Sequence, residues 1–209
     1  MAAIERTAYP TWQSCALHAS DIPVFYTPTK NEIQWVENSL RHSPGSKNQK
    51  QLSSHYQQHC LNVLVLLKCF QRFHYFPQLR TVPKEIVTYI QQHLGFPDDM
   101  RAHYQHTQIL YRHHTIIRDY LQVKPYTEGG KKIAEQIATA SAKVHNYPSD
   151  IINQLLEELI KKKFELPAYS HIDRLVQTTR HQINQTIFDT VYQKLPDKLK
   201  NKFLLLTKS

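Results

Sequence analysis

The sequence predicts an all-α protein with two helical-bundle modules, helix-turn-helix-like elements and an extended N-terminal arm. Apolar residues recur at intervals of three and four over most of the 209 residues, which is the period of an α-helix. Only 4 residues are glycine and 11 are proline, and the prolines punctuate the periodic segments. One run, from Leu61 to Pro77, is apolar on nearly every side of a helix, so protein must surround it.

Residues 1–28 are expected to form the arm. Pro10, Pro23 and Pro28 interrupt this stretch, and each favours an extended conformation in the residue before it. The apolar segment from Ile22 to Tyr26 could add one short strand or pack as part of the arm.

Residues 29–124 form the first predicted module. Thr29 and Glu32 have the spacing of a capping box, which predicts a helix to about residue 41. The long central helix should begin at residue 53 or 54 and end near residue 74. Pro83 and Gly95 mark the start and the end of the next helix, and a further helix is expected over residues 107–121.

The central run ends in basic and aromatic residues, which allow two interpretations. The aromatic residues can be core and helix cap. Alternatively, Lys68 and Arg72, which lie one helical turn apart, meet a polyanion at the surface.

Residues 125–209 form the second predicted module. The boundary falls between Val123 and Gly130, because this stretch holds Pro125 and two consecutive glycines. Helices are expected to about residue 145, over 148–163 and over 170–194. Ser170 and Asp173 have the spacing of a capping box at the start of the last of these.

The helix over 170–194 has two contrasting faces. The face expected to be buried carries Ile172, Val176, Ile183, Ile187 and Val191. The opposite, polar stripe carries His171, Arg174, Thr178, His181 and Gln185, at intervals of three and four. Side chains of this kind can contact base edges in a DNA major groove. The alternative is a solvated face of an ordinary amphipathic helix.

The net charge of +9 suggests a nucleic acid or an anionic membrane as the partner, although a soluble basic protein is an equally simple interpretation. A membrane role is disfavoured, because no helix combines a dense Lys/Arg face with an exposed apolar one. The triple lysine, Lys161 to Lys163, can complement the dipole at the end of a helix without any ligand.

The sequence offers little for catalysis or for cofactors. It contains neither GxGxxG nor GxxxxGK[ST], and no GxSxG or HExxH. His103, His106, His113 and His114 are close in sequence but have no cysteine near them, so we expect no metal site and no cofactor. The 3 cysteines suggest reduced thiols in a cytosol.

Several segments in order resemble the N-terminal region of the Tn-three family of replicative transposases. They are Glu5–Pro10, Phe25–Thr29, Leu66–Arg72 with Tyr75–Pro77, Tyr111–His114 with Ile117–Leu121, and Glu165–Ser170 with Asp173–Arg174. The resemblance covers about residues 4 to 195. This chain departs from the family at His74, where many members carry glycine, so its helix end is bulkier and the turn of the family is not implied at that position.

The resemblance implies a bacterial, cytoplasmic and nucleoid-associated protein of a mobile genetic element, active in transposition and DNA recombination. The N-terminal region of such transposases binds the terminal inverted repeats of the transposon as double-stranded DNA. The catalytic Asp-Asp-Glu domain lies further along in family members, so this chain is expected not to be an enzyme by itself.

Taken together, the charge pattern and the resemblance predict a set of DNA contacts. Phosphates are expected to meet Lys68, Arg72, Arg112, Arg118, Lys131, Lys132, Lys161, Lys162 and Lys163. Bases are expected to meet the 170–194 helix at Ser170, His171, Arg174, Thr178 and His181. His114 and Tyr169 are further expected DNA contacts, with no assignment to phosphates or bases. Arg6 of the arm could follow a minor groove.

The main rival interpretation is a protein–protein module. The chain would then bind itself or a full-length transposase, and a truncated product could act as a regulator or inhibitor. An enzyme in its own right would need a converging set of catalytic groups, which the sequence does not reveal.

Overall fold

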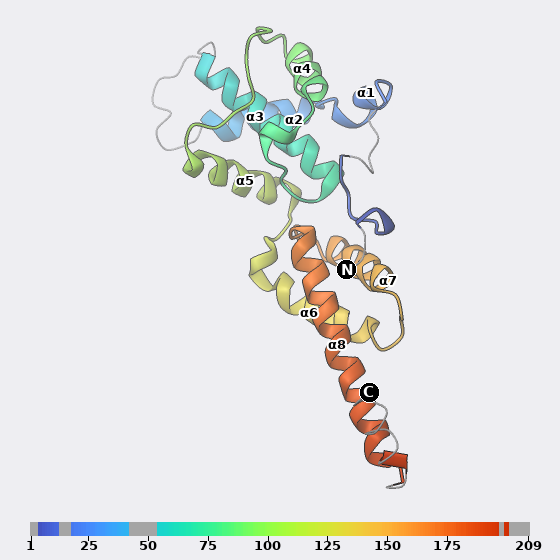
Figure 1. Cartoon of the computed structure of the whole chain (residues 1–209). Helices are drawn as coiled ribbons and strands as arrows, with labels where there is room; N and C mark the ends of the chain where they lie inside the picture. The colour runs from blue at the N-terminus through green and yellow to red at the C-terminus, as the bar shows by residue number, and fades with distance from the viewer. Residues whose placement is uncertain (1–3, 13–17, 42–53, 197–198, 201–209) are drawn as a thin grey trace. The chain divides into compact units, whose positions relative to one another are not determined.

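The computed structural model describes residues 4–12, 18–41, 54–196 and 199–200, and in these it confirms the all-α fold (Figure 1). The α-helices are α1 (Asp21–Tyr26), α2 (Lys30–Arg41), α3 (Ser54–Phe73), α4 (Lys84–His93), α5 (Thr107–Leu121), α6 (Lys131–Ser141), α7 (Pro148–Lys161) and α8 (Tyr169–Lys194). Short helical turns occur at Ile4–Arg6, Leu79–Thr81 and Tyr126–Gly130.

The helices divide into two compact units. The α3 unit consists of Pro10–Glu128 with Lys162–Leu166, and the α8 unit consists of Met1–Tyr9, Gly129–Lys161 and Pro167–Ser209. The units are therefore not consecutive in sequence, because residues 1–9 join the α8 unit and residues 162–166 join the α3 unit. Whether the expected segments 1–28, 29–124 and 125–209 act as functional modules stays a prediction.

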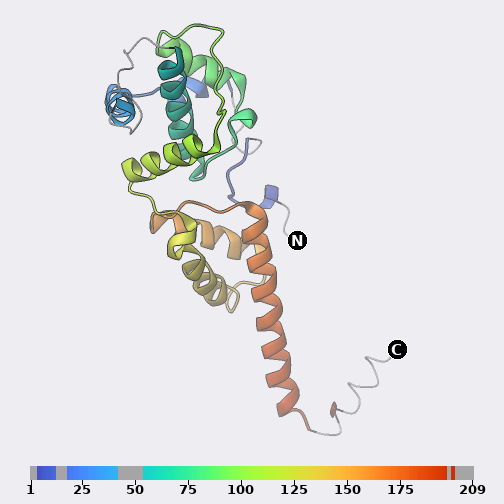
Figure 2. The ribbon, with the colours of Figure 1, turned by 90° about the vertical axis from the view of Figure 1, so that its left-hand side faces the viewer.

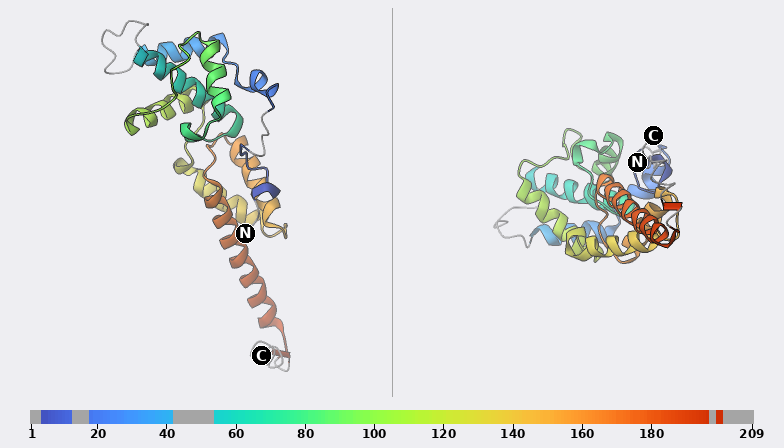
Figure 3. Two further views of the ribbon diagram at one scale, coloured as in Figure 1. Left: turned by 45° about the horizontal axis from the view of Figure 1, so that its top comes forward. Right: turned by 60° about the horizontal axis from the view of Figure 1, so that its bottom comes forward.

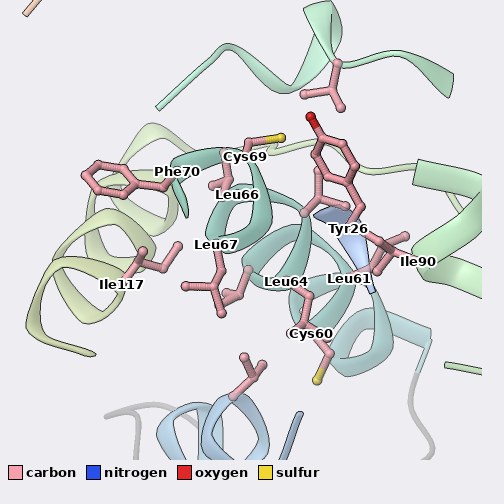
Figure 4. Close-up of a cluster of buried hydrophobic side chains, with 14 of the residues drawn as sticks. Tyr26, Cys60, Leu61, Leu64, Leu66, Leu67, Cys69, Phe70, Ile90 and Ile117 are labelled. Atoms are coloured by element: carbon pink, nitrogen blue, oxygen red, sulfur yellow. The ribbon is translucent and has the colours of Figure 1, made fainter. Parts of the chain in front are cut away.

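Helix α3 is the centre of its unit. Every residue from Cys60 to Phe70 is buried, and helices α1, α2, α4 and α5 pack around it. Figure 4 shows side chains pointing from α3 in several directions, with Ile117 of α5 and Ile90 of α4 among the residues they meet. The expectation of a helix enclosed by protein is confirmed, since Leu61, Val63 and Leu67 are completely buried.

The capping box at the start of α2 is confirmed and extends into a buried polar network. The Thr29 amide donates to Glu32 Oε2 at 2.7 Å, and the Glu32 amide donates to Thr29 Oγ1 at 3.2 Å. Gln71 Nε2 donates to Glu32 Oε1 at 2.7 Å, and Lys68 Nζ lies 3.4 Å from both carboxylate oxygens. Burial alone would raise the pKa of Glu32, but these hydrogen bonds and the Lys68 charge outweigh it and lower the pKa.

This network corrects one expected DNA contact. The Lys68 side chain is 10% exposed and forms an ion pair with Glu32, so the expectation that it meets a phosphate is wrong. The sequence placed Lys68 correctly one turn before Arg72, but the apolar residues on both sides of Lys68 keep it inside the unit.

The arm is also different from the expectation. Residues Asp21–Tyr26 form helix α1 instead of an extended strand, and α1 packs on α3 and α4. Pro23 lies in the first turn of this helix, where the missing amide hydrogen costs nothing. Tyr26 at the end of α1 is 1% exposed and belongs to the core of the α3 unit.

Helices α3 and α4 are each followed by a residue in the left-handed conformation, which is glycine in one case and histidine in the other. Gly95 follows α4 with a φ of +66°, as expected, whereas Pro83 precedes the helix by one residue instead of opening it. His74 follows α3 with a φ of +58°, in the left-handed region that favours glycine. Its amide donates to the Phe70 carbonyl at 2.7 Å.

Histidines of α3 and α5 lie together inside the α3 unit. The rings of His59 and His113 are 5.3 Å apart, and the His113 Nδ1 is 2.6 Å from the Tyr104 hydroxyl. Burial, aided by the charges of His59 and Arg112, lowers the pKa of His113 to about 3. Burial and the nearby Arg118 charge lower the pKa of His114 to about 4. Both rings are therefore neutral at physiological pH.

The α8 unit is a bundle of α6, α7 and α8, each in contact with the other two. Ala134, Ala138, Ile151, Leu155 and Val176 are among its completely buried residues. Only the first part of α8 contributes to this core. The last buried residue of the helix is Thr179, so the expectation that Ile187 and Val191 are buried is wrong.

Three further observations concern the described residues as a whole. Cys60 and Cys69 are buried free thiols, while Cys15 and Ser53 lie outside the described part of the chain. No described helix has both the length and the apolar character needed to cross a membrane. No cluster of histidine, cysteine or carboxylate residues in these ranges is arranged to hold a metal ion.

The Lys68–Glu32 pair predicts a specific pattern of stability. Glu32→Ala should lower the free energy of unfolding by about 3 kcal/mol, because it leaves the Lys68 ammonium buried without a partner. The double variant Glu32→Gln/Lys68→Met should recover most of this loss, since it removes the charge as well. Urea unfolding followed by circular dichroism measures both values. A loss below about 0.5 kcal/mol in Glu32→Ala would contradict the structural role of the pair.

The buried histidines predict a loss of stability on mild acidification. Between pH about 6.5 and pH 4 the unfolded state protonates its histidines, whereas His113 and His114 stay neutral in the folded state because their pKa values are lowered to about 3 and about 4. The unfolded state then binds up to two more protons, so the free energy of unfolding should fall by about 5 kcal/mol over this window, about half of it from each ring. In His113→Gln the slope should be smaller. A flat profile in the wild-type chain would contradict the burial of these rings.

Candidate nucleic-acid interface

One end of the α8 unit gathers several of the residues expected to contact DNA. Figures 1 and 2 both place the start of α6, the end of α7 and the start of α8 at the same end of this bundle. This end follows from the topology, because α7 returns along α6 and α8 begins where α7 finishes. It brings together residues that the sequence separates by about forty positions. Those on its three helices are Lys131, Lys132, Lys161, Tyr169, Ser170, His171 and Arg174.

The polar stripe of α8 is exposed along its length. His171, Arg174, Thr178, His181 and Gln185 are all exposed, on the side of the helix away from Ile172 and Val176. From Tyr169 to Phe188 the sole carboxylate is Asp173, which is 6% exposed and accepts a hydrogen bond from Gln177 Nε2 at 3.3 Å. The exposed surface of this stretch therefore presents only neutral and basic groups to a partner.

The start of α8 differs in detail from the expected capping box. The helix begins at Tyr169, and its N-cap residue Ala168 makes no side-chain capping hydrogen bond. Asp173, the other residue of the expected box, is 6% exposed. The expected capping role of Ser170 is therefore wrong. Ser170 is exposed in the first turn, where it is accessible to a ligand.

The N-terminal segment is attached beside this helix start. The Tyr9 hydroxyl donates to the Pro167 carbonyl at 3.0 Å, and its ring meets the Tyr169 ring edge-on at 5.5 Å. The Ala8 amide donates to Asn153 Oδ1 on α7 at 2.7 Å. These contacts attach the N-terminal segment, which includes the exposed Arg6, to the α8 unit. The roles of Tyr9 and Asn153 were missed from the sequence, because they depend on pairing residues about 150 positions apart.

The lysines of α6 and α7 differ in whether a neighbouring carboxylate balances their charge. Lys131 and Lys132 are exposed in the first turn of α6, where a positive charge is unfavourable beside the positive end of the helix dipole. An anionic ligand would offset that cost. Lys161, in contrast, lies within 3.1 Å of both Glu157 and Glu158. These carboxylates raise the pKa of Lys161 and balance its charge.

The segment between α7 and α8 is more than a tight turn. Seven residues separate the helices, from Lys162 to Ala168, and Lys162–Leu166 pack with the α3 unit. The Lys124 amide donates to the Lys163 carbonyl at 2.8 Å, and the Glu165 amide donates to the Lys124 carbonyl at 2.9 Å. Lys162 and Lys163 are exposed on this extended segment. The triple lysine is therefore divided between a helix end and a fixed strand-like connection.

Within the α3 unit, the expected contacts on α5 are partly engaged with protein. Arg118 Nε donates to Glu165 Oε2 at 2.7 Å. The His114 ring stacks on Phe76 with centroids 3.9 Å apart, and its Nε2 atom is buried without a hydrogen-bond partner among the described residues. Arg112 is half-buried. Arg118 and His114 thus hold the fold together, which the spacing of the sequence alone did not indicate.

Arg72 keeps an accessible position at the end of α3. It is exposed, and its guanidinium lies 4.1 Å from the centre of the Phe25 ring on α1. This cation–π contact orients the group while leaving its hydrogen-bond donors available. Arg72 therefore fits the expected phosphate contact better than its neighbour Lys68 does.

The arrangement suits binding more than chemistry. Exposed arginine, histidine, threonine and glutamine side chains on one helical face can donate to and accept from base edges, and surrounding lysines can contact phosphates. These groups come from rigid helices, which fix their spacing before a ligand arrives.

Comparison with known proteins assigns the chain to a family. A family model described as a domain of unknown function, DUF4158, matches residues 1–179. Because the match covers most of the chain, the chain belongs to this family. Among curated proteins, none matches the chain. The matched region includes the α3 unit and the first part of α8, where the polar stripe begins.

The Arg118–Glu165 contact predicts measurable coupling. Arg118→Ala and Glu165→Ala should each destabilise the α3 unit, and a double-mutant cycle should give a coupling energy of about 1–2 kcal/mol, because both groups are largely buried. The measurement is chemical unfolding of the two single variants and the double variant. Additive losses would show that the pair is not coupled, and Arg118 would again be a candidate for a contact outside the protein.

Proposed function

We propose that the chain is a duplex-DNA-binding region of a Tn-three family replicative transposase and that it recognises the terminal inverted repeats of a transposon. In this proposal these residues supply binding and the DNA-cutting chemistry resides elsewhere. The protein would work on bacterial DNA in the cytoplasm. The observation that carries the proposal is the exposed face of α8, which bears His171, Arg174 and Thr178 and no accessible carboxylate.

The electrostatics support DNA over an acidic protein. Lys131 and Lys132 have no balancing carboxylate in the first turn of α6, and Arg6 is carried to the same unit. Positive groups around a neutral, hydrogen-bonding stripe are what a duplex requires, with phosphates on both sides of a groove. The ordered resemblance of segments between residues 4 and 195 supports the transposase family as the source of this binding.

The division of labour between residues follows from their chemistry. Ser170, His171, Arg174, Thr178 and His181 would contact bases, with Tyr169 setting the first turn of the helix. Lysines at 131, 132, 162 and 163, together with Arg72 and Arg112, would contact phosphates and supply salt-dependent affinity. Arg118, His114 and Lys161 would contribute mainly to structure, since each already has a protein partner.

The proposal predicts different defects in two variants. Arg174→Ala should reduce discrimination between a terminal-repeat duplex and a scrambled duplex by about 1–3 kcal/mol, because it removes a base contact. Lys162→Ala should weaken binding to both duplexes equally and reduce the slope of log affinity against log salt by about 1. Fluorescence anisotropy at four salt concentrations measures both effects.

Two matched controls sharpen this test. Arg180→Ala removes the same side chain from α8, but Arg180 lies outside the polar stripe and donates to the Asn146 carbonyl between α6 and α7, so discrimination should persist. Lys84→Ala removes one exposed lysine from α4 and should leave the salt slope unchanged. Equal affinity of the wild-type chain for the two duplexes would refute sequence-specific recognition. Unchanged discrimination in Arg174→Ala would refute the assignment of α8 as the reading helix.

A further inference from the structure

The second half of α8 leaves the bundle that its first half completes. The left view of Figure 3 shows this helix continuing well past α6 and α7, which belong to the same unit. Thr179 is the last buried residue, and none from Arg180 to Lys194 is buried. An isolated helix of this length is marginal in water, so a lasting helix here needs packing that the bundle does not supply.

This projecting half carries an apolar stripe, which we define as Ile183, Ile187, Phe188 and Val191. Ile187 is 55% exposed, Phe188 51% and Val191 54%. The intervals of three and four place these side chains on one side of the helix. Single exposed apolar residues are common on protein surfaces, but a contiguous row of large ones marks an interaction surface.

The residues around the stripe carry almost no charge, and this favours an uncharged protein surface as the partner. From Gln182 to Gln193 the sole charged residue is Asp189, whose carboxylate accepts a hydrogen bond from Gln185 Nε2 at 3.1 Å. A DNA or membrane surface would require basic residues here, and an acidic or basic protein surface would require an opposite charge. Depletion of charge with enrichment of aliphatic and aromatic residues is instead typical of the core of a protein–protein interface.

We propose that the apolar stripe of α8 packs against the same stripe of a second copy of this chain, forming a dimer through paired helices. A neutral apolar stripe is complementary to itself, so two copies meet without bringing like charges together, despite the net charge of +9 per chain. The stripe and its flanking residues would bury roughly 1,000 Å² in total, which is the lower end for a specific interface. The dimer is therefore weak and depends on concentration.

This surface is separate from the one proposed to bind DNA. The apolar stripe lies beyond residue 179, where the family match ends, whereas the reading face begins at Ser170. Dimerisation would add a second DNA-reading face to the assembly without using any residue of the first.

Sedimentation velocity from about 1 to about 300 μM tests the proposal, because weak dimers dissociate in this range. The wild-type mass should rise from the 24.6 kDa of one chain toward twice that value. Ile187→Glu/Val191→Glu should remain a monomer throughout, because each copy would place two carboxylates in the apolar contact. Gln182→Glu/Gln193→Glu adds the same charge to the opposite face and should dimerise like the wild type.

The possible outcomes are distinct. Circular dichroism at about 1 μM, where the wild type is expected to be monomeric, should show equal helix content in the wild type and both double variants, since the substituted side chains are exposed. A monomeric wild type at every concentration, or equal dimerisation of Ile187→Glu/Val191→Glu, would overturn the proposal. Loss of duplex affinity in that variant, with a monomeric wild type, would overturn it in favour of a DNA contact. Discrimination measured with Arg174→Ala reports on DNA recognition independently of any of these results.

Discussion

The burial of α3 on all sides is the constraint on which the larger unit depends. Once the residues from Cys60 to Phe70 are removed from water, other helices must cover every face of α3, and α1, α2, α4 and α5 do so. The same constraint decides the fate of Lys68. A charged group inside this helix is tolerated only beside a buried carboxylate, and the α2 capping residue Glu32 supplies it. The Glu32 carboxylate therefore has two roles, because it caps the start of α2 and neutralises Lys68 in the core.

The α8 unit is built on a different principle, because one long helix serves several purposes along its length. Up to Thr179 one face of α8 completes a small bundle, while the opposite face carries the polar stripe. Beyond Thr179 the core face packs on none of the described helices of the unit, and Ile187 and Val191 are exposed. The chemistry of the exposed side thus changes along the helix, from hydrogen-bonding groups to aliphatic and aromatic ones.

Local patterns in the sequence predicted most of the helices, and contacts between distant residues account for what it missed. The capping box at Thr29, the apolar run of α3 and the glycine after α4 act over a few residues, so spacing was sufficient. The helix at Asp21–Tyr26 was missed because its stability comes from packing on α3 and α4. The exposure of Ile187 could not be read from periodicity, which gives the face of a helix but not how far the neighbouring helices extend. For the candidate site, periodicity identified the polar stripe, whereas the Glu165 partner of Arg118 required the fold.

The most direct test of DNA recognition by α8 is a hydroxyl-radical footprint of the protein with and without a terminal-repeat duplex. Oxidation of His171 and His181 should fall on binding, because the proposed interface covers both rings. Oxidation of Tyr147, which is 69% exposed at the turn between α6 and α7, should stay unchanged. Protection confined to other parts of the chain, with both histidines as reactive as before, would contradict the assignment of α8 as the DNA-reading helix.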